Sequence, residues 1–342
     1  MLRPVWLPHF GKGPGGDGIF SSPGNGSIFP IDTDTVDGVR EYTSFTLEAG
    51  DQMNITGTKP LLILCRGDFV VHGDIFLLGC DGDIGLDTDG SVAYENVNST
   101  PAGGVGGLGG PGAGAGGAGN NPVLGVNNGN GFAGESPRSL FDILDSAVGG
   151  GPGSATTADA EGGGGGGFGV AGDPGTNTSG TPGTNGGLAF GDDRFMKDID
   201  EFEPDRGYQP NANISGGTGG GGGSAFDTDG SGGQPANGDD GGGGGGGGGG
   251  GLWVICNGDI IISGSIQANG GDGGNVYATD QQIVDPGEDG EQGTDDDFIG
   301  GIIPTQVATP NGNGGPGGGG SGGAIFLIAE GDIDVSGGTL HA

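Results

Sequence analysis

The stretch DDGGGGGGGGGGGLWVICNGDIIISGSIQANGGDGG, residues 239–274, decides how this chain is expected to fold. Eleven consecutive glycines, Gly241 to Gly251, run directly into an apolar segment with the composition of a β-strand. Glycine loses more conformational freedom on ordering than any other residue, so a polyglycine tract is typical of a flexible linker. A tract of this kind joined to a strand needs a physical reason.

The overall composition shows that glycine-rich segments are a feature of the whole chain. The chain has 95 glycines among 342 residues, with 31% hydrophobic and 6% aromatic residues. Ordering 95 glycines costs on the order of 100–200 kcal/mol of backbone entropy, at roughly 1–2 kcal/mol per residue. Glycine has no side chain whose burial could offset this cost. The glycine tracts are therefore either disordered or hydrogen-bonded through their backbones on several sides.

The charge balance excludes several classes of partner. Acidic residues number 44 against 9 basic residues, which gives a net charge of −35. Nucleic acids and anionic membrane surfaces bind Lys/Arg patches, which this chain lacks. No stretch approaches the roughly 20 apolar residues of a membrane span. We therefore expect no nucleic-acid partner and no membrane insertion.

Three segments of the chain share one pattern: an apolar strand, x-Gly-Asp, a short alternating strand and a closing glycine. They are LLILCRGDFVVHGDIFL from Leu61, LWVICNGDIIISGSIQA from Leu252 and IFLIAEGDIDVSGGTL from Ile325, and a weaker copy, FTLEAGDQMNITG, starts at Phe45. The structural turn residues are Gly67, Asp68, Gly258, Asp259, Gly331 and Asp332. The glycine is expected to supply a positive φ, and the aspartate to bond nearby backbone. One unit cannot bury its apolar face alone, so the copies are expected to stack in parallel.

These patterns predict an all-β fold: a short stacked layer like a β-helix or β-solenoid, with long glycine-rich insertions and one or two short helices. Stacked strands would anchor the glycine tracts, which could then pack as polyglycine-II helices with lateral backbone bonds. The helices are expected in SPRSLFDILDSAV from Ser136 and DDRFMKDIDEF from Asp192. The predicted units are an attachment arm (1–40), first β-rungs (41–90), a glycine-rich insertion with the helices (91–251), a second rung (252–274), an acidic loop with a glycine tract (275–323) and a third rung (324–342).

Two kinds of candidate site follow from the loops. The motif DTDG occurs twice, and it places Asp87 and Asp89, and again Asp227 and Asp229, at the spacing that opens many calcium loops. Neither copy has the full EF-hand spacing, and solvated acidic loops are the alternative. The loops SVAYENVNSTP and NVYATDQQIVDPGEDG combine polar residues with occasional aromatics, as surface-recognition loops do. The receptor-contact candidates are Tyr94, Asn96, Asn98, Tyr277 and Gln281.

Catalysis is not expected, and calcium is the one cofactor considered. The three histidines have no metal-ligand or triad spacing, and the glycine runs lack the Lys-Ser/Thr of a phosphate-binding loop. Cys65 and Cys256 take equivalent places in two repeats, so adjacent strands would bring them within disulfide range. Free buried thiols are the favoured state. In the disulfide alternative, Cys80 would be left over.

The pattern FTLEAGDQMNITGTKPLLILCRGDFVVHGDIFLLG, followed by glycine runs and AIFLIAEGDIDVSGG, resembles two groups of proteins. One is the glycine-rich fibre and adhesin proteins of tailed phages, some of which carry polyglycine-II layers whose exposed loops bind the host receptor. The other is the PE-PGRS-like glycine-rich bacterial surface proteins. The first resemblance implies a non-enzymatic virion protein, a tail fibre or adhesin component that displays loops for host-surface recognition.

The same resemblance implies a set of partners. These are other virion subunits, bound through residues 1–40, and a glycan or protein of the host surface; a homo-oligomer is compatible with it. The N-terminal MLRPVWLPHFGKGPGG lacks the apolar run of a signal peptide, which favours a virion location over an extracellular or cell-surface one. The alternatives are a cell-surface matrix or filament protein, or a capsid or tail decoration protein without a receptor role.

Overall fold

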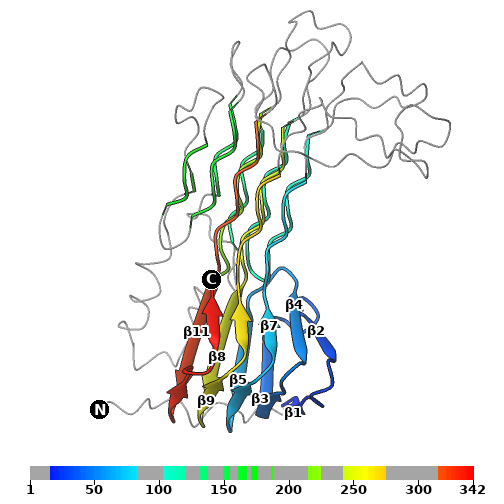
Figure 1. Ribbon diagram of the computed structural model, residues 1–342, viewed down its shortest axis with the longest axis vertical. Coiled ribbons are helices and arrows are strands. Elements are labelled where there is room, and N and C mark those ends of the chain that lie inside the picture. The colour runs from blue at the N-terminus through cyan, green and yellow to red at the C-terminus, as the bar shows by residue number, and fades with distance from the viewer. Residues whose placement is uncertain are drawn as a thin grey trace, which may run out of the picture.

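The computed structural model has a strand region and a glycine region, which continue into each other (Figure 1). The residues it describes are 16–83, 103–120, 131–137, 149–154, 161–167, 171–175, 186–187, 215–224, 242–274 and 315–342.

The strand region consists of two parallel sheets. The eight-stranded sheet has the order β11-β8-β5-β3-β6-β9-β12, with β1 paired to β3, and the five-stranded sheet has the order β13-β10-β7-β4-β2. The strands of the larger sheet are β1 (Gly18–Ser21), β3 (Val39–Leu47), β5 (Leu61–Cys65), β6 (Phe69–Val71), β8 (Gly251–Cys256), β9 (Ile260–Ile262), β11 (Ala324–Ala329) and β12 (Ile333–Asp334). Those of the smaller sheet are β2 (Ile28–Asp32), β4 (Gln52–Thr56), β7 (Asp74–Phe76), β10 (Ser265–Gln267) and β13 (Thr339–His341).

The predicted fold class, a β-helix-like or solenoid-like layer with one or two short helices, is wrong. The strands form a nearly closed, barrel-like parallel sheet and a second parallel sheet, and the described residues contain no helix. The reason for the continuous sheet is β3, whose residues 39–42 pair with β5 while residues 45–47 pair with β6. The repeat pattern began only at Phe45 and so did not reveal this long strand. The segments predicted as helices lie outside the described residues, apart from Ser136 and Pro137.

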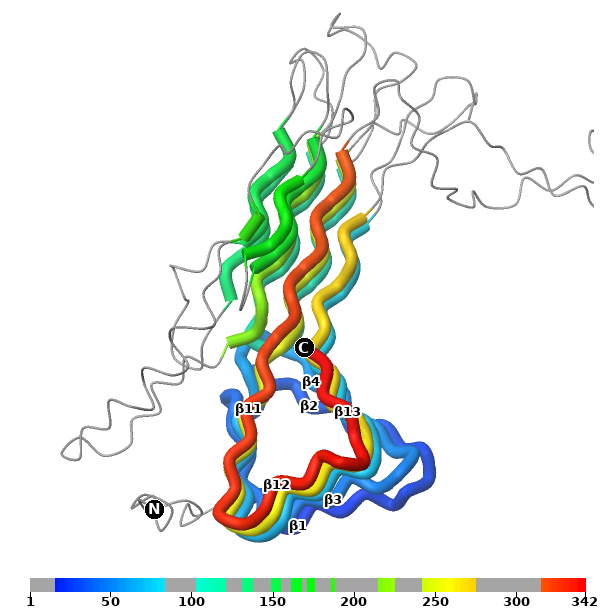
Figure 2. The backbone as a smooth tube through the Cα atoms, turned by 60° about the vertical axis from the view of Figure 1, so that its left-hand side comes forward, coloured from blue at the N-terminus to red at the C-terminus, as the bar shows by residue number. Residues whose placement is uncertain are grey.

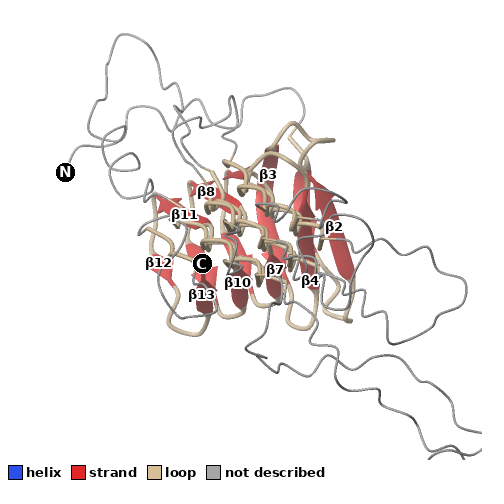
Figure 3. Ribbon diagram, turned by 90° about the horizontal axis from the view of Figure 1, so that it is seen from above, coloured by secondary structure: helices blue, strands red, loops and turns tan. Residues whose placement is uncertain are grey.

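The three repeated segments are paired in the register of their alignment. Cys65 lies opposite Cys256, and Cys256 lies opposite Ala329. After the Gly-Asp turn, β6 pairs with β9 and β9 with β12. Figure 2 shows the result end-on: corresponding strands of successive repeats overlie one another around a three-sided core. From above, in Figure 3, successive strands of each sheet lie side by side.

The hydrophobic core fills the space between the two sheets. Phe45 and Phe69, from neighbouring strands, stack with ring centroids 4.5 Å apart, and Phe20 stacks on Phe45 at 4.7 Å. Met53 and Ile75 contribute fully buried side chains from the smaller sheet. Apolar columns that run through all layers therefore hold the sheets together.

The N-terminal part of the described chain belongs to these sheets. Residues 16–40, predicted as part of an attachment arm, form β1, β2 and the start of β3. Phe20 and Phe29 pack against the core, and Ile31 is buried in it. Residues 1–15 of the predicted arm lie outside the described residues.

The glycine region is a lattice of extended tracts that run side by side away from the sheets (Figure 1). We call it the glycine lattice; it comprises residues 77–83, 103–120, 131–137, 149–154, 161–167, 171–175, 186–187, 215–224, 242–250, 268–274 and 315–323. Neighbouring tracts bond at every third residue. The N–H groups of Gly104, Gly107 and Gly110 donate to the carbonyls of Gly242, Gly245 and Gly248, each at 2.8 Å. A three-residue period is that of the polyproline-II conformation, which has no hydrogen bonds within one helix.

The tract 242–250 lies at the centre of the lattice. Each of its residues donates one backbone hydrogen bond and accepts another, at 2.7–3.1 Å. The partners are spread over six surrounding stretches: residues 77–83, 104–110, 114–120, 217–223, 271–274 and 315–324. The lateral bonding expected of the polyglycine run is therefore present.

Candidate functional site

The central tract must be glycine at every position because all of its sides are covered. A Cβ on Gly245, Gly246 or Gly247 would lie well under 3.0 Å from a carbonyl oxygen of a different neighbouring tract in each case. Those oxygens belong to Gly220, Gly271 and Leu108. Since three successive residues face three different neighbours, no position within the turn can carry a side chain.

A few buried hydroxyl groups connect the tracts through side chains. The Thr218 hydroxyl accepts from the Gly167 N–H at 2.8 Å and donates to the Gly167 carbonyl at 3.0 Å. The Ser224 hydroxyl bonds the Glu161 N–H and carbonyl in the same way, at 2.9 and 3.0 Å. Both residues are fully buried. The sequence analysis missed these contacts, and their signal was a single Thr or Ser within or at the end of a glycine run.

The end of the lattice far from the sheets gathers the ends of five connecting segments, residues 84–102, 121–130, 155–160, 225–241 and 275–314. We call this the distal end, formed by Asp83, Gly103, Asn120, Gly131, Ser154, Glu161, Ser224, Gly242, Gly274 and Gly315. These residues lie close together. The Gly242 N–H donates to Asn120 at 3.0 Å, and the Ser224 N–H donates to Glu161 at 3.1 Å.

The distal end brings together the flanks of the two predicted recognition loops. Gly244 donates to the carbonyl of Asp83 at 2.9 Å and accepts from the N–H of Gly274 at 2.7 Å. Asp83 precedes the segment that carries the candidates Tyr94, Asn96 and Asn98. Gly274 precedes the segment that carries Tyr277 and Gln281. One residue of the central tract thus fixes the starting points of both segments.

The predicted contact and metal residues themselves lie outside the described residues. This holds for Tyr94, Asn96, Asn98, Tyr277 and Gln281, and for Asp87, Asp89, Asp227 and Asp229. Within the described ranges, no group of three or more His, Cys, Asp or Glu side chains could hold a metal ion.

The predicted Gly-Asp turns form a ladder between layers. The Asp68 carboxylate accepts the N–H of Asp259 at 3.0 Å, and the Asp259 carboxylate accepts the N–H of Asp332 at 2.9 Å. Gly67, Gly258 and Gly331 do not have the positive φ that the sequence predicted. Glycine is needed at Gly258 for a different reason: a Cβ there would overlap the Asp68 carboxylate.

A second carboxylate, Asp51, organises the turn before β2, and the sequence analysis missed it. It is buried and accepts four backbone N–H groups, from Gly24 at 2.7 Å, Asn25 at 3.0 Å, and Gly26 and Ser27 at 2.8 Å. Burial acts to raise its pKa, but the hydrogen bonds from the Ser22 hydroxyl and these N–H groups outweigh burial and hold the pKa at about 2. The available signal was the Gly50-Asp51 pair in the weak fourth repeat.

The cysteines are free thiols, as the favoured prediction stated. Cys65 and Cys256 are buried in the core and Cys80 is exposed. The Cys256 thiol donates to the Gly67 carbonyl at 2.7 Å, and the hydrogen bond with Cys65 together with burial raises its pKa. The Cys256 thiol therefore stays protonated, and both buried cysteine side chains pack as small apolar groups.

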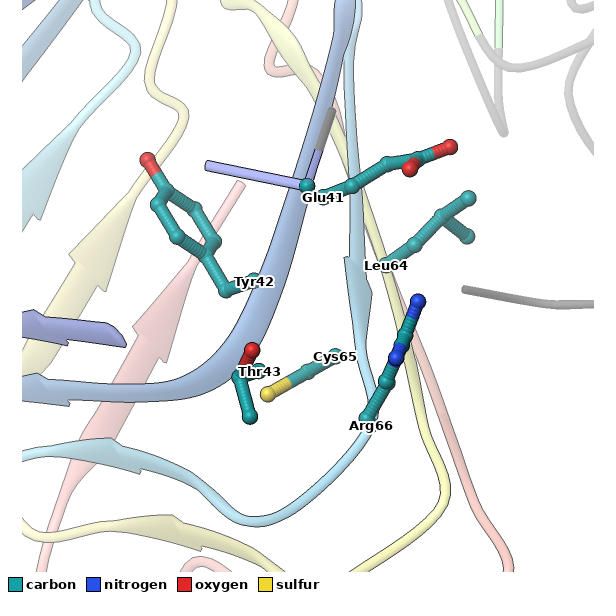
Figure 4. Close-up of a pocket in the computed structure, with 7 residues that line it drawn as sticks. Glu41, Tyr42, Thr43, Leu64, Cys65 and Arg66 are labelled. Carbon is teal, nitrogen blue, oxygen red and sulfur yellow. The ribbon is translucent and has the colours of Figure 1, made fainter. Parts of the chain in front are cut away.

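A small cavity beside Cys65 is not a convincing ligand site. It has a volume of about 230 Å³ and lies against β3 and β5. In Figure 4 the side chains of Glu41 and Arg66 point to one side, and Tyr42 lies on the other. Small-molecule sites typically have volumes of about 300–1,000 Å³. The distal end of the lattice is the stronger candidate.

Comparison with known proteins gave no match: no family model, no curated protein and no solved structure is detectably similar to this chain. In the described part of the chain, no helix has the length and apolar character needed to cross a membrane.

Proposed function

We propose that this chain is a non-enzymatic recognition protein, a tail-fibre or adhesin component of a virion that binds a host surface through loops carried on the glycine lattice. The observation that carries the proposal is the distal end, where the flanks of five connecting segments converge on one hydrogen-bonded scaffold.

Rigidity is the physical reason for such a scaffold. Binding costs free energy for every loop that must be ordered, so loops with fixed end points bind more tightly than loops on a flexible stem. The lattice supplies fixed end points because every backbone group of residues 242–250 is bonded to a neighbouring tract. At about 3.1 Å per residue, nine residues place the distal end roughly 28 Å from the sheets.

The composition of the segments supports recognition of a polar surface. The segments after Asp83 and Gly274 contain Asn, Thr, Gln and Asp with single tyrosines. Tyrosine supplies contact area at low entropic cost, while the polar side chains adapt their hydrogen bonds. A glycan or a protein of a host surface fits this chemistry.

Loop replacement tests the proposal. Residues 92–98 and 276–282 are replaced by Ser-Gly repeats of equal length, and binding of the labelled protein to a panel of bacterial cells is measured. The matched control replaces residues 138–148, whose flanks Pro137 and Gly149 lie away from the distal end. We expect the distal replacement to weaken binding at least tenfold and the control to leave it unchanged. Equal binding by both variants, or no binding of the unaltered chain to any cell, would contradict the proposal.

A further inference from the structure

One end of the molecule has no further layer among the described residues, although Gly163 and Gly166 donate to the carbonyls of Pro316 and Gly319 along one side of its glycine tract. It consists of the tract 315–323 together with β11, β12 and β13, and we call residues 315–342 the open end. In the layers beneath, β8 covers β5 and β11 covers β8. No described strand pairs with the outer side of β11, β12 or β13. Figure 2 shows this last layer, in orange and red, at the front of the stacked layers.

The open end exposes core positions that are buried one layer below. Ile333 and Leu340 are 47% and 42% exposed, whereas their register partners Ile260 and Ile266 are fully buried. The last layer therefore has the apolar side chains of an internal layer without the cover of one. An exposed apolar row beside unpaired strand edges is a surface for strand addition.

The Gly-Asp ladder is also unfinished at this end. Asp68 and Asp259 each accept the N–H of the next aspartate, but the Asp332 carboxylate has no hydrogen-bond partner among the described residues. In both lower steps, a glycine lies over the carboxylate where any Cβ would overlap it. The chain that completes the ladder must therefore place a glycine over the Asp332 carboxylate and offer the backbone N–H of the residue that follows it.

The glycine lattice offers the same kind of edge. In the central tract, the N–H groups of Gly246 and Gly249 donate to carbonyls of the next layer. The equivalent N–H groups of Gly319 and Gly322 have no partner within the described residues. They lie along a groove of about 930 Å³, which is lined by residues 162–163, 165–166, 171–175 and 316–323 and by Ala342. An extended glycine-rich segment supplies carbonyls at the matching three-residue spacing.

We propose that the open end binds one further layer, a glycine tract followed by strand–Gly-Asp–strand, supplied by a different polypeptide. This inference is independent of the recognition role of the distal end. The layers below give the format. Strands β8 and β9 pair in register with β11 and β12, and Gly319 and Gly322 are the counterparts of the donors Gly246 and Gly249. Pro316, the counterpart of Gly243, has no N–H, so the lattice edge offers these two donors.

A second copy of this chain does not offer that format. At its opposite end, Pro30 lies on the edge strand β2, and the N–H of Thr33 shows that odd-numbered residues face β4. Pro30 therefore faces the free edge, where it has no N–H to donate and opposes strand addition. Two open ends placed face to face would bring Glu330, Asp332 and Asp334 against the same acidic residues. The partner is accordingly a different chain, whose turn carries fewer acidic residues than Glu330, Asp332 and Asp334 provide.

The probe is residues 242–274 of this chain with Cys256→Ser, fused to a soluble carrier and titrated onto the full-length protein. We expect saturable binding and slower amide exchange at Gly319, Gly322 and Ile333, whose register partner Ile260 donates its N–H to the next layer. The matched control probe carries Gly258→Ala as well, which places a Cβ against the Asp332 carboxylate, and should bind at least tenfold more weakly. Asp332→Ala in the full-length protein should weaken binding of the first probe severalfold.

A second measurement covers failure of the free probe to fold. The same two segments are joined after Ala342, and exchange at Gly319 and Gly322 is compared. Protection by the unaltered segment alone supports the proposal. Absence of binding and of protection in both formats, or equal behaviour of the Gly258→Ala segment, overturns it. Sedimentation of the unaltered protein as a dimer with protected Gly319 would identify a second copy as the occupant and also overturn it.

Discussion

The sheets and the glycine lattice are both ordered regions, but they are stabilised in opposite ways: the sheets by burial of side chains and the lattice by backbone hydrogen bonds. In the sheets, side chains such as Phe45 and Phe69 stabilise the fold by burial, and the backbone is bonded on two sides. In the lattice, the backbone of residues 242–250 is bonded to six surrounding stretches and no side chain fits between them. A residue that strengthens one region therefore disrupts the other.

The lattice depends on the sheets for its alignment. Net hydrogen bonding contributes about 0.5–1.5 kcal/mol per bond, which is close to the roughly 1–2 kcal/mol needed to order one residue. In the lattice alone, the free energy gained from hydrogen bonds is thus close to the entropic cost of ordering the backbone. Its tracts continue directly into strands, since Gly250 precedes β8, Gly323 precedes β11, and β7 ends just before Leu77. The hydrophobic core beneath holds these starting points in register.

The largest effect is expected from the core. Phe69→Ala removes a fully buried ring that stacks on Phe45, and we expect it to lower the free energy of unfolding by about 3–5 kcal/mol. Because the strands align the tracts, glycine amides of residues 242–250 should lose exchange protection together with the core amides. Hydrogen exchange measured residue by residue tests both. Retained protection of the lattice in a variant with a weakened core would show that the lattice is stable alone.

A substitution in the lattice, in contrast, should affect the lattice and leave the sheets intact. Gly246→Ala places a methyl group against the Gly271 carbonyl, and we expect a loss of roughly 1–3 kcal/mol, as for overpacked sites. Amides of the surrounding tracts should exchange faster while those of β6 and β9 remain protected. The matched control is Gly319→Ala, where the nearest atom to the new Cβ is 3.6 Å away. If both substitutions cost the same, close packing is not what requires glycine in the central tract.

This contrast also explains how much of the structure could be predicted from the sequence. The repeats located the strands and the register of Cys65 with Cys256, because turn residues and apolar positions recur together. They did not reveal that β3 joins the two halves of one sheet, because its first half follows no repeat. Gly258 was correctly identified as a turn residue, but its reason is contact with Asp68 of another layer, which local patterns do not contain.

For the candidate site, the sequence indicated the candidate recognition loops but not the arrangement of the glycine tracts that position their ends. Glycine runs predicted lateral bonding, but the convergence of Asp83 and Gly274 on Gly244 depends on which tract lies beside which. Glycine residues are identical to one another, so neither composition nor period can specify these neighbours. For the tracts 77–83, 242–250, 268–274 and 315–323, the order comes from the strands to which they are attached.

A smaller, pH-dependent effect should separate the turn at Asp51 from the rest of the sheet region. Its pKa is about 2 in the folded protein, against an ordinary value of 3.8. A lowered pKa means that the group stabilises the fold above pH 3.8 and that this stabilisation is lost as the pH falls toward 2.

We therefore expect the urea midpoint of the unaltered protein to fall between pH 4 and 2 more steeply than that of Asp51→Asn. The amide of the variant cannot titrate, and it keeps one oxygen for the N–H groups of residues 24–27. The measurement is a series of urea unfolding curves at fixed ionic strength. Parallel pH profiles for the two proteins would show that the Asp51 carboxylate does not contribute to the pH dependence.

The smallest effect is expected on the Gly-Asp ladder, where the two regions can be compared at the level of one hydrogen bond. Asp259→Ala removes the acceptor of the Asp332 N–H, and we expect a loss of about 0.5–1 kcal/mol because the site is exposed to water. Glu330→Ala is the matched control: it lies in the same turn, is exposed and should leave stability unchanged. Amide exchange at Asp332 should accelerate in the first variant only. Because water can replace a lost acceptor at this surface but not between the tracts, the ladder should tolerate the loss of a partner far better than the lattice tolerates the gain of a methyl group.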